Sequence, residues 1–373
     1  MCRLLILAFL TSTAHLYGTI CLNMIVKNES RAIEQCLVSV KPLIDSWVIV
    51  DTGSTDGTQE IIRKVLKDVP GELHERPWVN FEHNRNEALG LAKNKAEYLL
   101  FLDADERLIY LDSFRHQAFN QDAYTVKVEQ ADGLSYERML LVKSDLDWKW
   151  EGVVHEWIRC PAAKRIEFLP QVINFSDTSK GARSQDPQKY LRDAHILEQA
   201  LAQDPTNSRY VFYLAQSYAN AGQYPLALQR YQQRALMGGD EQQVFWSLYC
   251  TARLHDLSHA PSSVIVESFL AAFHYRPSRV EPLYRLIQHY LSTGDYLPAY
   301  LLSKEAIRIP MPLTDIYVEH SLYEYAVLFQ FVQCAHRVGK YAEASQATEQ
   351  LLANSRLPAA ERAALEQQFL ARR

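Results

Sequence analysis

Long apolar runs that end at polar clusters organise the first half of the chain. Such runs lie at residues 19–26, 47–50 and 98–102. They lack the alternating polar positions of a strand with one face in water, so we interpret them as strands buried on both faces. Ile33 and Leu37 recur at helical spacing after the first run. Because crossover connections of this kind make neighbouring strands parallel, the pattern predicts an α/β fold, Rossmann-like, with a mostly parallel sheet and helices on both faces.

The polar clusters that follow these runs are expected to meet at one edge of the sheet. Lys27 and Glu29 follow the first run, Asp51 the second, and Asp103 and Asp105 the third. Ligands of open α/β sheets bind just beyond the carboxyl ends of the strands. Asp103 and Asp105 are two positions apart, so in an extended segment both can converge on one hard cation and, through it, on phosphate. A solvated turn after a strand is the alternative for this pair.

Further along, the pattern turns toward β-structure. Residues 123–128 and 136–142 favour strands, and residues 148–157 combine three tryptophans with a glycine and the neighbours His155 and Glu156. Aromatic residues at this density beside polar groups indicate the wall of a binding site more than a general core. A hydrogen-bonded core histidine is the alternative for His155.

The second half is expected to be helical throughout. Loop-forming residues gather at 174–187, and there we divide the chain into domains at residues 19–185 and 186–373. The motif Gly-x-Tyr-x-x-Ala begins at Gly222, Gly294 and Gly339. It is typical of the turn and second helix of a tetratricopeptide unit, so the pattern predicts tetratricopeptide-like repeats. An unrelated helical bundle is the alternative, because the spacing of the motif is irregular.

Composition narrows the function and the location. The net charge of −5 and the lack of a strip of aromatic and basic residues argue against nucleic-acid binding. The six cysteines have neither metal-site spacing nor a compact disulfide pattern, which favours a reducing, cytoplasmic location. Residues 1–18 contain a basic start, a short apolar run and small residues, as a signal peptide does. They are a signal peptide into the secretory pathway or an apolar N-terminal extension.

Five segments of the first half carry a family resemblance. They are residues 23–29 (NMIVKNE), 50–58 (VDTGSTDGT), 85–86 (RN), 102–106 (LDADE) and 152–156 (GVVHE). On these segments the first half resembles the family 2 glycosyltransferases, which have the GT-A fold. The chain after residue 18 is similar to a subgroup with a tetratricopeptide tail, to which residues 209–218 also correspond. The resemblance implies metal-dependent transfer of a hexose from a nucleotide-sugar, expected to be UDP-linked, with inversion at the anomeric carbon.

The resemblance also implies roles for single residues. The residues expected around the nucleotide are Lys27, Glu29, Asp51, Arg85 and Asp103, with Asp51 on the nucleobase. Asp103 and Asp105 of the DXD motif would bind Mn²⁺ or Mg²⁺, and His155 would supply a later ligand. The ion would offset the charge that grows on the departing diphosphate.

Glu156 is the expected catalytic base, because it follows the proposed ligand His155. The chain lacks the late Glu-Asp pair that marks the base in the simplest family members, so Asp132 and Glu151 remain alternatives. The helical repeats are expected to hold the acceptor, which is a glycan, peptide or protein, or to form a homodimer.

Two other functions compete with this hypothesis. An inactive glycosyltransferase-like scaffold would bind protein partners through its repeats. Retention of both Asp103 and Asp105 argues against it. A dinucleotide-dependent oxidoreductase would need a Gly-x-Gly-x-x-Gly turn after the first strand, and residues 27–30 (KNES) do not provide one.

Overall fold

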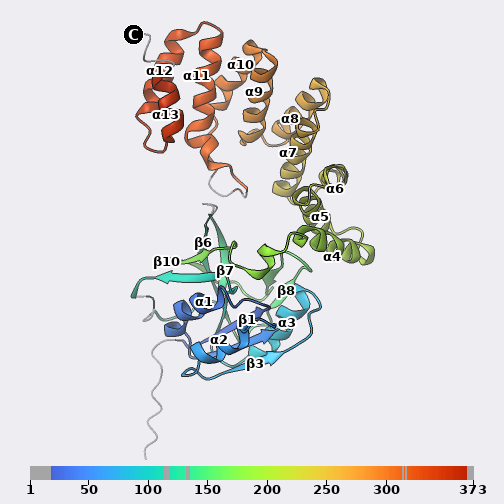
Figure 1. Ribbon diagram of the computed structural model, residues 1–373, viewed down its shortest axis with the longest axis vertical. Coiled ribbons are helices and arrows are strands. Elements are labelled where there is room, and N and C mark those ends of the chain that lie inside the picture. The colour runs from blue at the N-terminus through green and yellow to red at the C-terminus, as the bar shows by residue number, and fades with distance from the viewer. Residues whose placement is uncertain are drawn as a thin grey trace, which may run out of the picture. The chain divides into compact units, whose positions relative to one another are not determined.

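The computed structural model describes residues 18–112, 114, 117–131, 135–312, 315 and 317–367. They form two compact units, and the boundary in the sequence falls between Ile196 and Leu197. The first unit is α/β and the second is helical (Figure 1). The predicted signal peptide or apolar extension lies outside the described residues except for Gly18. Among the described helices, none combines the length and the apolar character needed to cross a membrane.

An eight-stranded sheet forms the first unit. Its strands, in spatial order, are β3 (Gly71–Glu75), β2 (Ser46–Asp51), β1 (Ile20–Val26), β4 (Tyr98–Phe101), β7 (Ser135–Lys143), β6 (Ala123–Gln130), β10 (Ile166–Ser176) and β5 (Glu106–Tyr110). The first four strands are parallel, β7 runs antiparallel to β4 and β6, and β10 is parallel to β6 but antiparallel to β5. A separate hairpin pairs β8 (Lys149–Glu151) with β9 (Trp157–Arg159). The predicted α/β fold is confirmed.

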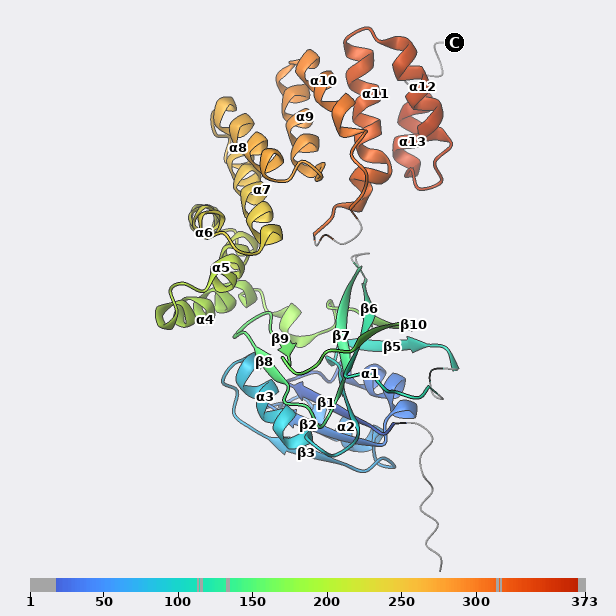
Figure 2. The same cartoon turned by 180° about the vertical axis from the view of Figure 1, so that it is seen from behind.

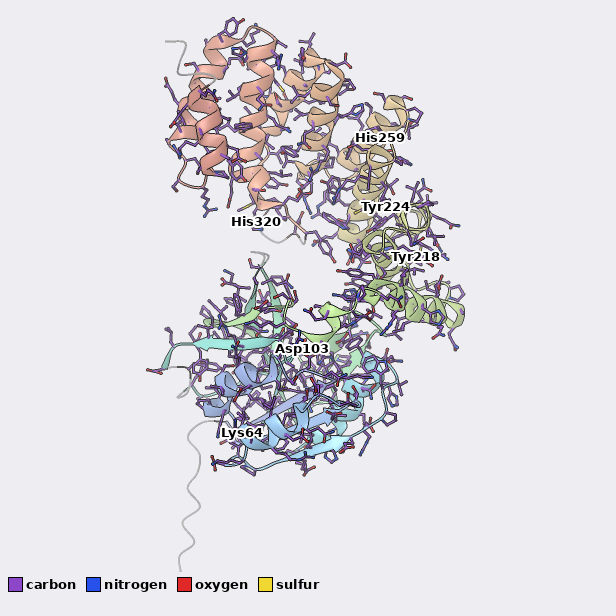
Figure 3. The ribbon with its side chains drawn as sticks, viewed as in Figure 1. Lys64, Asp103, Tyr218, Tyr224, His259 and His320 are labelled. Atoms are coloured by element: carbon purple, nitrogen blue, oxygen red, sulfur yellow. The ribbon has the colours of Figure 1, made fainter. Side chains whose placement is uncertain are left out.

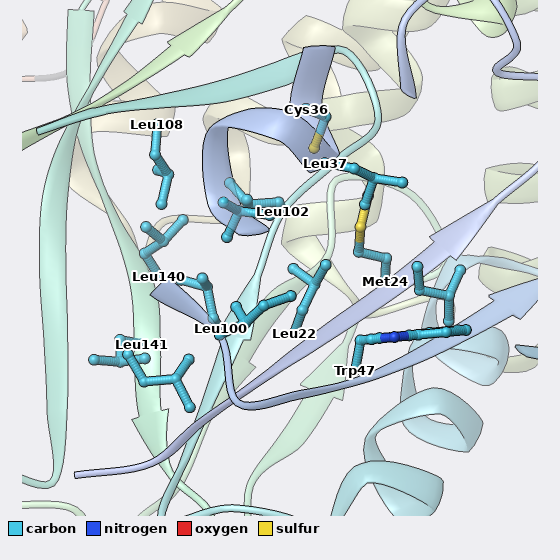
Figure 4. Packing of buried hydrophobic residues seen from close by; sticks show 14 of the residues in the cluster. Leu22, Met24, Cys36, Leu37, Trp47, Leu100, Leu102, Leu108, Leu140 and Leu141 are labelled. Atoms are coloured by element: carbon cyan, nitrogen blue, oxygen red, sulfur yellow. The ribbon is translucent and has the colours of Figure 1, made fainter. Parts of the chain in front are cut away.

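Helices cover both faces of the parallel half of this sheet, which explains its continuous apolar strands. On one face Leu22 and Leu100 pack with Leu37 of α1 (Ile33–Val40), in the cluster drawn in Figure 4; this cluster also includes residues of α2 (Thr58–Val65). On the other face Cys21 and Leu99 pack with Leu89 of α3 (Phe81–Ala92). Full burial of such a side chain contributes about 1.5–3 kcal/mol, which favours apolar residues on both faces of these strands. Asn23 of β1 is a buried polar exception, and its side chain donates to the carbonyls of Val48 and Ala88.

The second unit is a series of helix pairs (Figure 2). The helices that follow the sheet are α4 (Lys189–Gln203), α5 (Ser208–Asn220), α6 (Tyr224–Leu236), α7 (Glu241–Leu257), α8 (Ser262–Tyr275), α9 (Glu281–Thr293), α10 (Tyr296–Ala306), α11 (Val327–Arg337), α12 (Tyr341–Leu352) and α13 (Ala359–Leu365). Short turns of other helix types are η1 (Lys41–Leu43), η3 (Ala182–Gln185) and the π-helical η4 (Leu322–Ala326). From α5 to α12, each α-helix packs against the next, including α10 against α11, although η4 lies between those two in the sequence. The predicted helical second half is confirmed.

Left-handed backbone at the turns explains the repeated glycine. Gly222, Gly294 and Gly339 have φ values of 72°, 86° and 77° and connect α5 to α6, α9 to α10 and α11 to α12. Glycine adopts such angles without a steric penalty. In the connection from α7 to α8, His259 has a positive φ of 53° instead. The repeat motif is therefore missing from this pair although the helix pair itself is present.

Candidate active site

The loops after β1 and β2 hold each other in place at the carboxyl edge of the sheet. Asn28, with a left-handed φ of 57°, donates its backbone N–H to Ser54 Oγ at 2.8 Å and accepts the backbone N–H of Thr55 at 2.8 Å through its side chain. The backbone N–H of Glu29 donates to Thr58 Oγ1 at 2.8 Å. These reciprocal bonds fix the position of Glu29 relative to the end of β2.

Asp51 ends β2 and is completely buried. Its Oδ1 accepts two backbone N–H groups, from Gly53 and Ser54, each at 2.7 Å. Its Oδ2 is buried and has no hydrogen-bond partner among the described residues. A buried acceptor without a partner is costly, so Asp51 offers one acceptor to a ligand that brings an N–H group. Lys27 lies exposed at the end of β1. The nucleotide contacts of both residues stay predictions.

Arg85 joins two of the predicted site residues. From α3 its Nη2 donates to Asp103 Oδ1 at 2.7 Å and its Nε donates to Glu156 Oε1 at 2.5 Å. The guanidinium also lies over the ring of Trp150, 4.9 Å from its centroid. Figure 3 labels Asp103, which follows β4. Residues from three distant parts of the chain, 85, 103 and 156, therefore form one ion-pair cluster.

A second arginine supports the same carboxylate, and the sequence analysis missed it. Arg138 of β7 lies 2.6 Å from Glu106 Oε2 and 3.7 Å from Asp103 Oδ2. Burial opposes ionisation of Asp103, but Arg85 and Arg138 hold its pKa below its ordinary value. The sequence feature that could have revealed Arg138 is its place within the largely apolar strand 136–142, because a buried arginine needs a charged partner.

The negative charges of Asp105 and Glu29 are balanced less well by nearby arginines than the charge of Asp103. Burial, followed by the negative charge of Asp103, Glu106 and Glu29, raises the pKa of Asp105 to about 7. Burial likewise raises the pKa of Glu29 to about 7, although the backbone N–H of Ala182 donates to its Oε2 at 3.2 Å. Carboxylates that repel each other in this way favour a cation between them.

The segment after β10 covers these two carboxylates. Asp177 donates its backbone N–H to the carbonyl of Asp105 at 3.0 Å. A Cβ placed on Gly181 would lie 2.7 Å from Asp105 Oδ2, so only glycine leaves that carboxylate its position. Arg183 of η3 pairs with Asp193 of α4 and stacks over Phe81, 4.5 Å from the ring centroid. We name residues 177–185 the covering segment.

Replacing Gly181 by alanine is expected to turn the Asp105 side chain without unfolding the protein. Gly181 has an ordinary φ of −62°, and the atom in the way is the end of a side chain. We expect the sugar transfer that the family resemblance implies to fall by about tenfold, which corresponds to roughly 1.4 kcal/mol, while the thermal midpoint stays unchanged. Steady-state transfer rates and thermal unfolding check this, with Gly90→Ala, whose added Cβ meets open space in α3, as the control. Unchanged transfer would show that the position of Asp105 is unimportant.

The predicted third metal ligand, His155, comes from the turn between β8 and β9. His155 is exposed and has a left-handed φ of 55° in the turn that follows β8. In the part of the chain that is described, no three His, Cys, Asp or Glu side chains are grouped closely enough to hold a metal ion. Asp103 and Asp105 do present the carboxylate oxygens that Mn²⁺ and Mg²⁺ prefer. The assignment of Asp103, Asp105 and His155 as ligands stays a prediction.

The alternatives for the catalytic base are not equivalent. The Glu156 side chain is mostly buried and belongs to the Arg85 cluster. Glu151 Oε1 lies 3.9 Å from Arg159 Nη1 on the β8–β9 hairpin. Among the described residues, no hydrogen bond or ion pair given above joins Glu151 to the Arg85 cluster. Asp132 lies outside the described residues. The geometry therefore favours Glu156 over Glu151.

Comparisons with known proteins add the family context. Residues 21–109 match the model of Glycosyl transferase family 2. The SPbeta prophage-derived glycosyltransferase SunS of Bacillus subtilis is 26% identical over 210 residues, which are 52% of this chain and 48% of SunS. A TPR repeat-containing protein of Synechococcus elongatus is 32% identical over 144 residues, covering 36% of this chain and 34% of that protein. The crystal structure of TarS from S. aureus aligns with 64% of this chain and 52% of its own chain, at 14% identity and a TM-score of 0.36. The chain spans less than half of the length of the two curated relatives.

Proposed function

We propose that this protein transfers a hexose from a UDP-linked sugar to an acceptor. In support, residues 21–109 match the model of Glycosyl transferase family 2, and tetratricopeptide-like repeats follow them. The observation that carries the proposal is the cluster of Arg85, Asp103 and Glu156 beside Asp105 at the carboxyl edge of the sheet. This edge is where α/β sheets bind their ligands.

The donor would lie along this edge. Asp51 receives the nucleobase through its unpartnered Oδ2, while Lys27 and Glu29 lie near the nucleotide. Asp103, Asp105 and His155 would hold a divalent cation, Mn²⁺ or Mg²⁺. When bound, such a cation would supply Lewis-acid stabilisation of the negative charge on the departing diphosphate. Arg85 and Arg138 place two further positive charges beside Asp103.

Glu156 serves as the base. The acceptor oxygen attacks the anomeric carbon, the bond from that carbon to the diphosphate breaks, and the acceptor's proton passes to Glu156. One such displacement inverts the anomeric centre. Arg85 orients Glu156 through the hydrogen bond of 2.5 Å that its Nε donates to Glu156 Oε1. The helical repeats hold the acceptor, which is a glycan, peptide or protein.

A panel of nucleotide-sugars tests the proposal. With manganese present, we expect release of UDP from one UDP-sugar and faster release when the acceptor is added. General bases contribute about 10²–10⁴-fold, so Glu156→Gln should lower transfer by at least ~10²-fold. Glu151→Gln is the matched control on the neighbouring hairpin and should keep its activity. If no nucleotide-sugar is bound or cleaved, the catalytic proposal is wrong and an inactive scaffold that binds partners through its repeats becomes the better account.

A further inference from the structure

One segment between α10 and α11 crosses the first helices of three successive repeats. This crossing segment consists of residues 315 and 317–320, and its last residue, His320, is labelled in Figure 3. The ring of Tyr317 stacks on Trp246 of α7, with 4.8 Å between centroids and 26° between the planes. The centroid of the same ring lies 6.2 Å from the ring centroid of Phe212 of α5. A single tyrosine thus contacts aromatic residues of two repeats.

The next contact of the segment is made by a carboxylate. Glu319 accepts the hydroxyl hydrogen of Tyr249 of α7 at 2.7 Å and pairs with Arg285 Nη2 of α9 at 2.8 Å. Arg285 Nε also donates to the Tyr249 hydroxyl at 3.1 Å. Tyr249 and Arg285 therefore form a ready acceptor site for one carboxylate, in a geometry that fits a charge-assisted hydrogen bond.

Two features distinguish this contact from ordinary core packing. The Arg285 and Glu319 side chains remain 30% and 27% exposed, so their pair lies where a ligand from solvent can compete for it. Tyr317 has a left-handed φ of 57°, a conformation that a tyrosine adopts only when its surroundings hold it there. In contrast, Asp315 is almost buried against Arg276 at 2.6 Å and anchors the start of the segment.

We propose that Phe212, Trp246, Tyr249 and Arg285 form a binding surface for a peptide with an aromatic residue followed two positions later by a carboxylate. The crossing segment is its internal occupant: Tyr317 takes the place of the aromatic residue and Glu319 that of the carboxylate. An incoming peptide displaces them while Asp315 stays anchored. The binding surface is defined by these four side chains and is independent of sugar transfer, so an inactive first unit would leave it intact.

The test uses the full-length protein and a fluorescent peptide with the sequence of residues 315–322 (DIYVEHSL). We compare the natural chain with the double variant Tyr317→Ala, Glu319→Gln, which empties the surface. An internal occupant present roughly 90% of the time lowers the apparent affinity about tenfold, so the variant should bind the peptide at least ~10-fold more tightly. Binding is measured by fluorescence anisotropy.

Two controls make the result specific. Adding Trp246→Ala to the double variant should abolish binding, whereas adding Tyr224→Ala, an exposed tyrosine of α6, should leave binding unchanged. A peptide with its Tyr and Glu replaced by Ala and Gln should not bind. If the double variant is folded and does not bind the natural peptide, or binds both peptides equally, the proposal is wrong and the segment is only structural.

A second measurement covers the case in which the double variant does not fold. The backbone N–H of Glu319 donates to Glu281 Oε1 at 3.2 Å in the natural chain. The hydrogen-exchange rate of this N–H therefore reports whether the crossing segment occupies the binding surface. Excess peptide should speed exchange at Glu319 and His320 of the natural protein and leave the inner turns of α12 unchanged. Exchange that stays the same at saturating peptide would contradict displacement.

Discussion

Replacing Asp103 by asparagine is expected to reduce sugar transfer by at least ~10²-fold, because one electrostatic contact made in the transition state is worth about that much. The change keeps the size of the side chain and removes the charge that pairs with Arg85 at 2.7 Å and with Arg138 at 3.7 Å. In the proposed mechanism two effects add: a bound cation would lose one of its carboxylates, and Arg85 would lose its partner Asp103, which lies beside Glu156. Steady-state transfer at saturating donor and manganese measures the loss.

The control for this variant is Asp147→Asn. Asp147 also pairs with a cation, Lys93 at 2.6 Å, but its side chain is 91% exposed and lies outside the cluster. Its transfer rate should match that of the natural chain. If Asp103→Asn keeps transfer within about threefold, a difference worth roughly 0.7 kcal/mol, neither the carboxylate nor its hold on Arg85 matters for the reaction.

The second large effect concerns the stability of the helical unit. Glu281→Ala is expected to lower the free energy of unfolding by about 3 kcal/mol, because it leaves the buried charge of Arg279 with the longer contact to Asp315 at 3.5 Å. Arg279 and Glu281 are 1% and 0% exposed and lie 2.8 Å apart. The Tyr323 hydroxyl also donates to Glu281 at 3.0 Å, and Arg279 stacks over Phe245. Urea unfolding followed by circular dichroism measures the change.

An exposed pair provides the comparison. Glu305 and Arg308 are 2.9 Å apart in the same unit, but their side chains are 63% and 66% exposed. Exposed pairs contribute about 0–1 kcal/mol, so Glu305→Ala should shift the urea midpoint little. Replacing Arg279 and Glu281 together by methionine should recover most of the stability, since no buried charge remains unpaired. A small loss for Glu281→Ala alone would mean that Asp315 or water compensates the charge of Arg279.

Local patterns were enough to predict the parallel half of the sheet. Strands β1, β2 and β4 were recognised because both of their faces are covered by helices, which removes polar positions from the sequence. The repeat turns were recognised where glycine supplies the left-handed angle, and the unit with His259 lacked that signal. The pairing of β10 with β5 and β6 depends on contacts between distant residues, and a local pattern carries no information about such partners.

The candidate site was predictable in its residue types but not in its pairings. The position of Asp103 after an apolar run located the edge, whereas the two bonds of Arg85 arise only when α3, β4 and the turn after β8 are packed together. Arg138 was missed because one arginine in a strand pattern does not reveal its partners. The crossing segment has no periodic pattern at all, since its conformation follows the surface on which Tyr317 and Glu319 lie.

The strand order also determines how this domain can be cut. The stretch that matches the family model, residues 21–109, ends inside β5, whose described sheet neighbour is β10 at Ile166–Ser176. An excised piece with those limits would leave β5 unpaired and one side of β4 open where β7 belongs. Bare strand edges template association with other chains. The stretch that carries the family signature is therefore expected to aggregate when separated, and the smallest piece able to fold extends at least through Ser176.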